Sequence, residues 1–183
     1  MSEIDAVFID RDGTLGGDDT VQYPGTFELF PYSFEAITRL KEAGIYVFSF
    51  TNQPGISSGR ATLEEFREEL NRFGFTDVFI CPHKPEENCH CRKPQPGMLR
   101  AAAAKYKELD LEKCVVIGDR WSDMAAADKV NATKILVKTG AGKTTLIDSS
   151  KIDYAANNLK DAVEWLYQSF DLKKQSVLKV DDA

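Results

Sequence analysis

The sequence has few histidines and cysteines, no excess of basic residues and no long hydrophobic run, and each shortage limits its function. Only two histidines and four cysteines occur among 183 residues. Basic residues number 23 against 29 acidic ones, which gives a net charge of −6. This charge argues against nucleic acid as a ligand, because binding the phosphate backbone usually requires a basic surface. A small phosphorylated molecule held by a few local cations remains compatible with it.

No hydrophobic run approaches the roughly 18 residues of a membrane-spanning helix, and segment 1–5 lacks a basic and then apolar leader. We therefore expect a soluble, cytoplasmic protein with no membrane partner, in a reducing compartment. In such a compartment, clustered cysteines more often bind metal than form disulfides. A hydrophobic fraction of 43% and a charged fraction of 28% are typical of a globular chain. A monomer is expected.

Apolar runs of strand length alternate with helix-like segments along most of the chain. Strands are expected at 6–9, 45–50, 78–80, 114–117 and 135–137, and helices at 33–43, 62–73, 96–109, 123–129 and 159–170. This alternation predicts an α/β fold with one Rossmann-like, doubly wound, mostly parallel sheet. Residues 1–170 are expected to form a single domain, and residues 171–183 a polar C-terminal tail.

Paired aspartates follow the first expected strand. The run VFI at 7–9 is apolar on both faces, as in a strand buried inside a parallel sheet, and it leads directly into DRDGT at 10–14. Residues two apart on an extended chain point to the same side, so Asp10 and Asp12 can share one site. Two carboxylates this close require a cation or a raised pKa. Mg²⁺, which prefers oxygen ligands, is the expected cation.

Three further polar stretches lie at the ends of other expected strands or before helices. Thr51 and Asn52 offer a hydroxyl and an amide suited to phosphate oxygens. Arg92 and Lys93 precede a helix start, a position that attracts anions. The stretch GDRWSD at 118–123 places two carboxylates four residues apart. Each alone is compatible with a turn, a helix cap or solvated surface. Together they predict one site, because ligands collect beyond the carboxyl ends of parallel strands.

These stretches resemble the four ordered motifs of the haloacid dehalogenase (HAD) superfamily. The matching residues are Asp10-x-Asp12-Gly13-Thr14, Thr51-Asn52, Lys93 and Gly118-Asp119-x-x-x-Asp123. The resemblance covers residues 5–140 and implies a HAD-like fold without a large cap domain. It also implies an Mg²⁺-dependent phosphatase that hydrolyses phosphomonoesters of a small metabolite. In this interpretation Asp10 is the nucleophile that forms an aspartyl-phosphate, and Asp12 is the general acid that then activates water.

The resemblance implies roles for the other motif residues as well. Thr51 and Lys93 would hold the transferring phosphoryl group. Substrate contacts are expected from Asn52, Arg92 and Arg120. The magnesium ligands are expected to be Asp10, Asp12 through its backbone carbonyl, Asp119 and, in support, Asp123. Asp12 favours phosphate-ester cleavage over dehalogenation, since a general acid accelerates departure of the alkoxide by ~10²–10⁴-fold.

Three cysteines and both histidines fall within eleven residues. Thiolate and imidazole are the ligands that Zn²⁺ prefers, so Cys81, His83, Cys89 and Cys91 form a candidate structural zinc site. His90 is the weaker candidate because it lies between two proposed ligands. The alternatives from the residues alone are a disulfide between Cys89 and Cys91, or free thiols in a loop.

The pattern CxH at 81–83 followed by CxCRKP at 89–94 resembles the zinc loop of a small-capped HAD subgroup. That subgroup includes histidinol-phosphate phosphatases and D-glycero-D-manno-heptose-1,7-bisphosphate phosphatases. The resemblance implies a structural zinc ion that orders the loop carrying Arg92 and Lys93.

Both substrates of that subgroup stay open. The five residues between His83 and Cys89, and the GDR at 118–120, look more like the histidinol-phosphate enzymes. The stretches TNQPGI at 51–56 and PQPGML at 94–99 look more like the heptose enzymes. The stretch GGDDT at 16–20 matches neither pattern, although substrate-facing residues are expected there.

Functions of other classes are also compatible with parts of the sequence. A non-catalytic phospho-receiver domain carries acidic residues, a threonine and a lysine on a doubly wound sheet, and a zinc-stabilised binding module is a further alternative. The segment TGAGKTT at 139–145 is similar to a nucleotide-binding P-loop, but Val137 stands where that pattern requires glycine. The segment is therefore predicted to be a flexible glycine turn.

Overall fold

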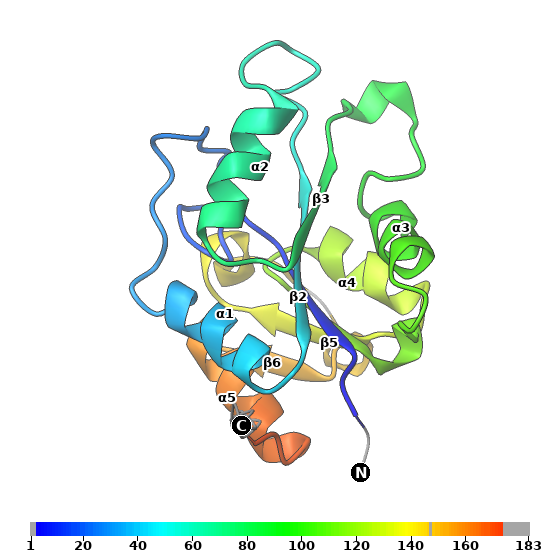
Figure 1. The fold of residues 1–183 in the computed structure, drawn as a ribbon. Coiled ribbons are helices and arrows are strands. Elements are labelled where there is room, and N and C mark those ends of the chain that lie inside the picture. Colours follow the sequence, from blue (N-terminus) through cyan, green and yellow to red (C-terminus); the bar gives the residue numbers. More distant parts are fainter. Residues whose placement is uncertain (1–2, 147, 174–183) are drawn as a thin grey trace, which may run out of the picture.

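The structure is a computed structural model that describes residues 3–146 and 148–173. The described residues form six strands in one sheet, in the order β3-β2-β1-β4-β5-β6, and every neighbouring pair is parallel (Figure 1). The strands are β1 Ala6–Ile9, β2 Tyr46–Asn52, β3 Asp77–Cys81, β4 Cys114–Gly118, β5 Thr133–Val137 and β6 Tyr154–Ala156. The predicted doubly wound α/β sheet is confirmed, and all of its pairings are parallel.

Five α-helices of the described residues cover the two faces of this sheet. They are α1 Ser33–Glu42, α2 Leu63–Arg72, α3 Gly97–Lys105, α4 Trp121–Asp128 and α5 Leu159–Ser169. Val7 and Ile9 of β1 belong to a buried cluster with α1 and α5, whereas Phe8 belongs to a second cluster with α3 and α4. Figure 1 shows these helix pairs on opposite sides of the sheet. Burial on both faces explains why β1 is a continuous apolar run.

Some element boundaries differ from the prediction. The sequence pattern does not predict β6, because its three residues form too short an apolar run. Helix α3 ends at Lys105 instead of residue 109, since Tyr106 takes an extended conformation and packs its ring against Tyr46 and Phe48. Helix α4 starts at Trp121, two residues earlier than expected, with Asp123 in its first turn.

The strand order places the motif residues at the centre of the sheet. The chain connects β1 to β2 on one side and continues from β3 to β4 on the other, so the order reverses beside β1. Ligands of open α/β sheets bind at such a reversal, outside the carboxyl ends of the strands. Asp10 follows β1, Thr51 lies at the end of β2, and Asp119 follows β4. The fold therefore brings three of the four motifs to one edge.

No separate cap domain occurs within residues 3–146 and 148–173, because segments 10–32 and 53–62 connect β1 to α1 and β2 to α2 through turns and isolated bridges. Among these residues, no helix has both the length and the apolar character that a membrane span requires. Of the predicted C-terminal tail, residues 171–173 follow α5, and residues 174–183 lie outside the described part of the chain.

Candidate active site

Three buried carboxylates meet at the carboxyl edge of the sheet. Oxygen atoms of Asp10, Asp119 and Asp123 all lie within 4.8 Å of one another. Burial and the charges of Asp10 and Asp123 raise the pKa of Asp119 to about 8. Burial raises the pKa of Asp123 to about 6, with a smaller contribution from Asp10 and against the lowering effect of Lys93. These shifts indicate that burial disfavours the ionised forms of these two carboxyl groups, and that the neighbouring carboxylates add to the effect.

Lys93 supplies one positive charge to this cluster. Its Nζ atom lies 2.8 Å from Asp10 Oδ1 and 2.7 Å from Asp123 Oδ1, and it donates to the carbonyl of Phe50 at 3.0 Å. Burial alone lowers the pKa of Lys93, but Asp10 and Asp123 raise it above its ordinary value, so the ammonium is charged. One ammonium among three carboxylates leaves the group with excess negative charge when all are ionised.

Asn52 fixes the backbone of Lys93. Asn52 Oδ1 accepts a hydrogen bond from the Lys93 amide at 3.0 Å, and Asn52 Nδ2 donates to the Lys93 carbonyl at 3.2 Å. The sequence predicts a substrate contact for Asn52, and in the structure both polar atoms of its side chain are engaged with Lys93. Asn52 nevertheless lines the same pocket as Lys93.

Asp119 is held in place by two segments distant in sequence. Its Oδ2 accepts from the amide of Ala141 at 2.8 Å, and its Oδ1 accepts from Thr14 Oγ1 at 3.3 Å. Gly13 has φ +81°, and a Cβ atom there would collide with the Asp119 carboxylate. The segment predicted to be a flexible turn instead forms a 3₁₀ helix, Gly140–Lys143, hydrogen-bonded to this aspartate.

The donor set of the carboxylate cluster fits a magnesium ion. Carboxylate oxygens are the hard ligands that Mg²⁺ prefers, and a divalent cation would stabilise the ionised forms of Asp119 and Asp123, which burial disfavours. Asp10, Asp119 and Asp123 would hold such an ion, each through one oxygen.

The Asp12 carboxylate lies beside this cluster and is not one of its three members. Its Oδ1 accepts from Arg11 Nη1 at 2.6 Å, and its Oδ2 accepts from Gln53 Nε2 at 2.7 Å. Burial raises the pKa of Asp12 above its ordinary value, although Arg11 lowers it. Asp10 and Asp12 thus share the site, as the strand pattern predicts, but have different partners.

A pocket of about 350 Å³ opens at these residues. Its lining residues are Asp10, Asp12, Thr20, Val21, Thr51, Asn52, Pro54, Arg92, Lys93, Arg120 and Ser122. Seven of them are site residues predicted from the sequence. The other four have no role assigned from the sequence, although Thr20, Pro54 and Ser122 lie in stretches that the sequence patterns single out. Arg92 and Arg120 give the wall of the pocket two cations in addition to Lys93.

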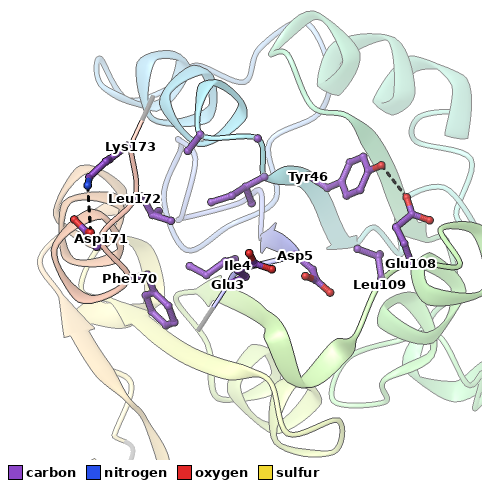
Figure 2. Close-up of a pocket in the computed structure, with 13 residues that line it drawn as sticks. Glu3, Ile4, Asp5, Tyr46, Glu108, Leu109, Phe170, Asp171, Leu172 and Lys173 are labelled. Carbon is purple, nitrogen blue, oxygen red and sulfur yellow. Dashed lines mark hydrogen bonds and ion pairs between the residues drawn. The ribbon is translucent and has the colours of Figure 1, made fainter. Parts of the chain in front are cut away.

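A larger pocket, of about 550 Å³, lies at the opposite edge of the sheet (Figure 2). Its lining comes from the residues before β1 and β2 and from the end of α5, and includes Ile4, Tyr46 and Phe170. None of the predicted site residues contributes to it. Convergent charged groups with shifted pKa values mark a functional site better than volume does, so the smaller pocket is the candidate active site.

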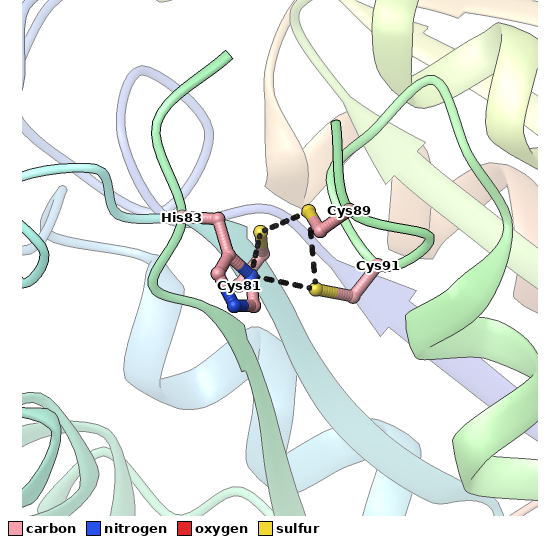
Figure 3. Close-up of side chains that lie close together, drawn as sticks. All are labelled: Cys81, His83, Cys89 and Cys91. Carbon is pink, nitrogen blue, oxygen red and sulfur yellow. Dashed lines mark hydrogen bonds between the residues drawn. The ribbon is translucent and has the colours of Figure 1, made fainter. Parts of the chain in front are cut away.

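The four predicted zinc ligands form a compact cluster (Figure 3). The Sγ atom of Cys81 lies 3.6 Å from His83 Nδ1 and 3.6 Å from Cys89 Sγ. Cys91 Sγ lies 3.2 Å from His83 Nδ1 and 3.5 Å from Cys89 Sγ. Ligands at tetrahedral positions about 2.3 Å from a zinc ion would be about 3.7 Å apart, close to these separations. Three thiols and an imidazole with this spacing fit zinc, and the cysteines are not in disulfides.

The Cys/His cluster is connected directly to the segment that carries Lys93. The amide of Arg92 donates to Cys89 Sγ at 3.3 Å, and Arg92 Nη1 donates to the carbonyl of His83 at 3.3 Å. The His90 side chain is not a member of the cluster. The cluster therefore fixes the residue that immediately precedes Lys93.

This fold is the one that the HAD resemblance implies. A family model described as "HAD-hyrolase-like" matches residues 90–162. The D-glycero-beta-D-manno-heptose-1,7-bisphosphate 7-phosphatase of Pseudomonas putida is 41% identical over 152 residues, which cover 76% of this chain and 86% of that protein. The enzyme of the same name from Escherichia coli K12 is 34% identical over 176 residues, covering 86% of this chain and 91% of that protein.

A solved structure of an enzyme of this kind also matches the fold of this chain. The crystal structure of D,D-heptose 1,7-bisphosphate phosphatase from Bordetella bronchiseptica, complexed with magnesium and phosphate, matches with a TM-score of 0.78 and 31% identity. The match covers 91% of this chain and 99% of that one. The chain therefore belongs to the HAD superfamily phosphatases, in the family of these heptose-bisphosphate enzymes.

Proposed function

We propose that this protein is an Mg²⁺-dependent phosphatase that removes one phosphate from a small sugar bisphosphate through an aspartyl-phosphate on Asp10. The observation that carries the proposal is the position of Asp10. Its carboxylate faces the pocket, contacts Lys93 at 2.8 Å and belongs to the cluster that fits a divalent ion. A carboxylate that attacks a phosphate dianion needs positive charge around it to overcome the repulsion.

The proposed reaction has two steps on the protein's own residues. An oxygen of Asp10 attacks phosphorus and the ester P–O bond breaks, while Asp12 gives its proton to the leaving oxygen. Water then attacks the aspartyl-phosphate, Asp12 takes up the proton, and inorganic phosphate leaves with Asp10 restored. Thr51 and Lys93, both in the pocket wall, would hold the phosphoryl oxygens. Bound Mg²⁺ would supply further positive charge to those oxygens.

The heptose-bisphosphate relatives support a sugar bisphosphate as the substrate, in preference to histidinol phosphate. A bisphosphate carries a second phosphate group that also needs cations. Arg92 and Arg120 line the pocket and are suited to that group, since guanidinium binds phosphate through paired hydrogen bonds. In this proposal the heptose-1,7-bisphosphate is hydrolysed at its 7-phosphate, as the names of the relatives state for those enzymes.

We further propose that Cys81, His83, Cys89 and Cys91 hold a structural zinc ion. Its contribution would be to keep the backbone of Arg92 in place and, through it, to position Lys93. The zinc ion would share no ligand with the magnesium ion, because the Cys/His cluster and the carboxylate cluster have no residue in common.

The function is tested by steady-state hydrolysis of heptose-1,7-bisphosphate, histidinol phosphate and 4-nitrophenyl phosphate with added Mg²⁺. We expect the heptose substrate to give the highest kcat/KM, and Asp10→Asn to abolish hydrolysis of all three while leaving the melting temperature near that of the wild type. Full activity of Asp10→Asn would overturn the mechanism. A higher kcat/KM for histidinol phosphate would overturn only the proposed substrate.

A further inference from the structure

Arg11 is a fully buried cation that the proposed reaction does not use. It lies between the two aspartates of the DxD motif, just after β1, and its side chain has no solvent exposure. Its guanidinium carbon lies 3.8 Å from the ring centre of Phe27 and 4.9 Å from that of Phe66. An arginine without solvent exposure, stacked between two aromatic rings, is held in one orientation.

The guanidinium of Arg11 bridges two carboxylates. Its Nε and Nη2 atoms donate to Glu69 Oε1 at 3.0 and 2.7 Å, and its Nη1 atom donates to Asp12 Oδ1 at 2.6 Å. Glu69 lies on α2 and is itself buried. Glu69 alone would neutralise the arginine, so charge balance does not account for the third hydrogen bond, to Asp12.

The other oxygen of Asp12 is fixed from a second strand. Gln53, directly after β2, donates from Nε2 to Asp12 Oδ2 at 2.7 Å and to Thr51 Oγ1 at 2.9 Å. Gln53 is fully buried, and its backbone N–H donates a hydrogen bond to the carbonyl of Cys81 at 2.8 Å. Each oxygen of Asp12 therefore has a side-chain donor built on a different element. A protonated carboxyl group retains enough lone pairs to accept both hydrogen bonds.

We propose that Arg11 and Gln53 are positioning residues that fix the carboxyl group of Asp12 at the leaving oxygen of the substrate. This inference rests on the proposed function, in which Asp12 gives its proton to that oxygen. Glu69, which lies on α2, holds the guanidinium of Arg11, so this helix takes part in orienting the carboxyl group of Asp12. Neither Arg11 nor Gln53 contacts the reacting atoms in this assignment. Misplacement of a catalytic group by about 1 Å can cost about 10²-fold in rate, which makes such a support measurable.

The test compares esters whose leaving groups differ in their need for a proton. A primary alkyl phosphate needs the acid, whereas 4-nitrophenyl phosphate, whose leaving group is stable as an anion, needs it little. Asp12→Asn should lower kcat/KM for the alkyl ester by ~10²–10⁴-fold and much less for the aryl ester. Arg11→Met and Gln53→Met should likewise lower the ratio of kcat/KM for the alkyl ester to kcat/KM for the aryl ester, by at least about tenfold. Arg11→Lys, which keeps one charge but not the planar fork, should fall between Arg11→Met and the wild type.

Leu70→Ala is the matched control. Leu70 is a buried apolar residue of α2, and its side chain takes no part in the hydrogen bonds of Asp12 and Arg11. It should lower the melting temperature without changing the alkyl-to-aryl ratio. If Arg11→Met does not fold, Gln53→Met decides the proposal. An unchanged ratio in the positioning variants, with the ratio shifted in Asp12→Asn, would overturn the inference alone. An unchanged ratio in Asp12→Asn would overturn both the inference and the acid role of Asp12.

Discussion

Asp123 Oδ1 lies 2.7 Å from Lys93 Nζ, while its other oxygen accepts a hydrogen bond from the amide of Arg120 at 3.0 Å. One side chain thus caps the start of α4 and faces the buried ammonium. The sequence leaves both roles open for Asp123, and the structure combines them. The arrangement links helix α4, Lys93 and the carboxylate cluster, because Asp123 contacts both the Arg120 amide and the Lys93 ammonium.

Two substitutions at Asp123 separate these roles. Asp123→Asn keeps an oxygen for the Arg120 amide but removes the charge, so we expect an intact helix and a loss of Mg²⁺-dependent activity of about 10–100-fold. Asp123→Ala removes the cap as well and should cost a further ~1 kcal/mol in the free energy of unfolding. Denaturant unfolding and kcat/KM measured on both variants test this. Equal unfolding free energies would contradict the capping role.

Lys93→Met removes the only ammonium that contacts the described carboxylate cluster. We expect kcat/KM to fall by about 10²–10³-fold, the usual cost of losing a group that stabilises transition-state charge. Without Mg²⁺, the loss of a buried partner should also destabilise the protein by about 3–5 kcal/mol. The matched control is Lys105→Met, because Lys105 pairs with Asp77 on the surface and such pairs contribute at most about 1 kcal/mol. A control variant that loses as much activity would contradict the assignment.

The sequence predicts the carboxylate edge because the relevant signals are local. An apolar run ending in charged residues marks a buried strand that leads into a site, and the strand order then brings these ends together. The Cys/His cluster is predicted for the same reason, since its ligands lie in two short segments.

The environment of Asp12 is not predictable in this way. Arg11 looks like an exposed charge between two aspartates, and Glu69 belongs to the polar pattern of an amphipathic helix. Both are buried, and Arg11 donates a hydrogen bond to Glu69 across 58 positions of the sequence. Likewise, the glycine-rich segment at 140–143 has the composition of a mobile turn. It is ordered by Asp119, whose position depends on the whole sheet.

The raised pKa values of Asp119 and Asp123 predict a pH-dependent response to Mg²⁺. The pKa of Asp119 in the folded protein is about 8 and that of Asp123 about 6, against an ordinary value of 3.8. Between the ordinary pKa and the raised pKa of each group, the folded state binds more protons than the unfolded state. The Mg²⁺-free protein therefore loses stability as pH rises from about 4 to about 8. Mg²⁺ binds the ionised carboxylates and should reverse this loss.

We therefore expect a larger increase in melting temperature at pH 8 than at pH 6 when MgCl₂ replaces KCl at equal ionic strength. Asp119→Asn is the control, because its amide does not titrate and the difference between the two pH values should shrink. The same Mg²⁺ effect at both pH values in the wild type would contradict the assignment of the raised pKa to the metal cluster.

The proposed zinc site predicts different results for two cysteines of the same chain. Cys89→Ser removes one of four ligands, so zinc affinity should fall by at least about 10–100-fold and metal analysis should give well below one zinc per chain. Activity should fall together with zinc content, because Cys89 Sγ accepts a hydrogen bond from the amide of Arg92, the residue directly before Lys93. Cys114→Ser is the matched control, since Cys114 is a buried core residue of β4 outside the cluster. It should retain zinc and activity, and zinc loss in Cys114→Ser but not in Cys89→Ser would contradict the ligand assignment.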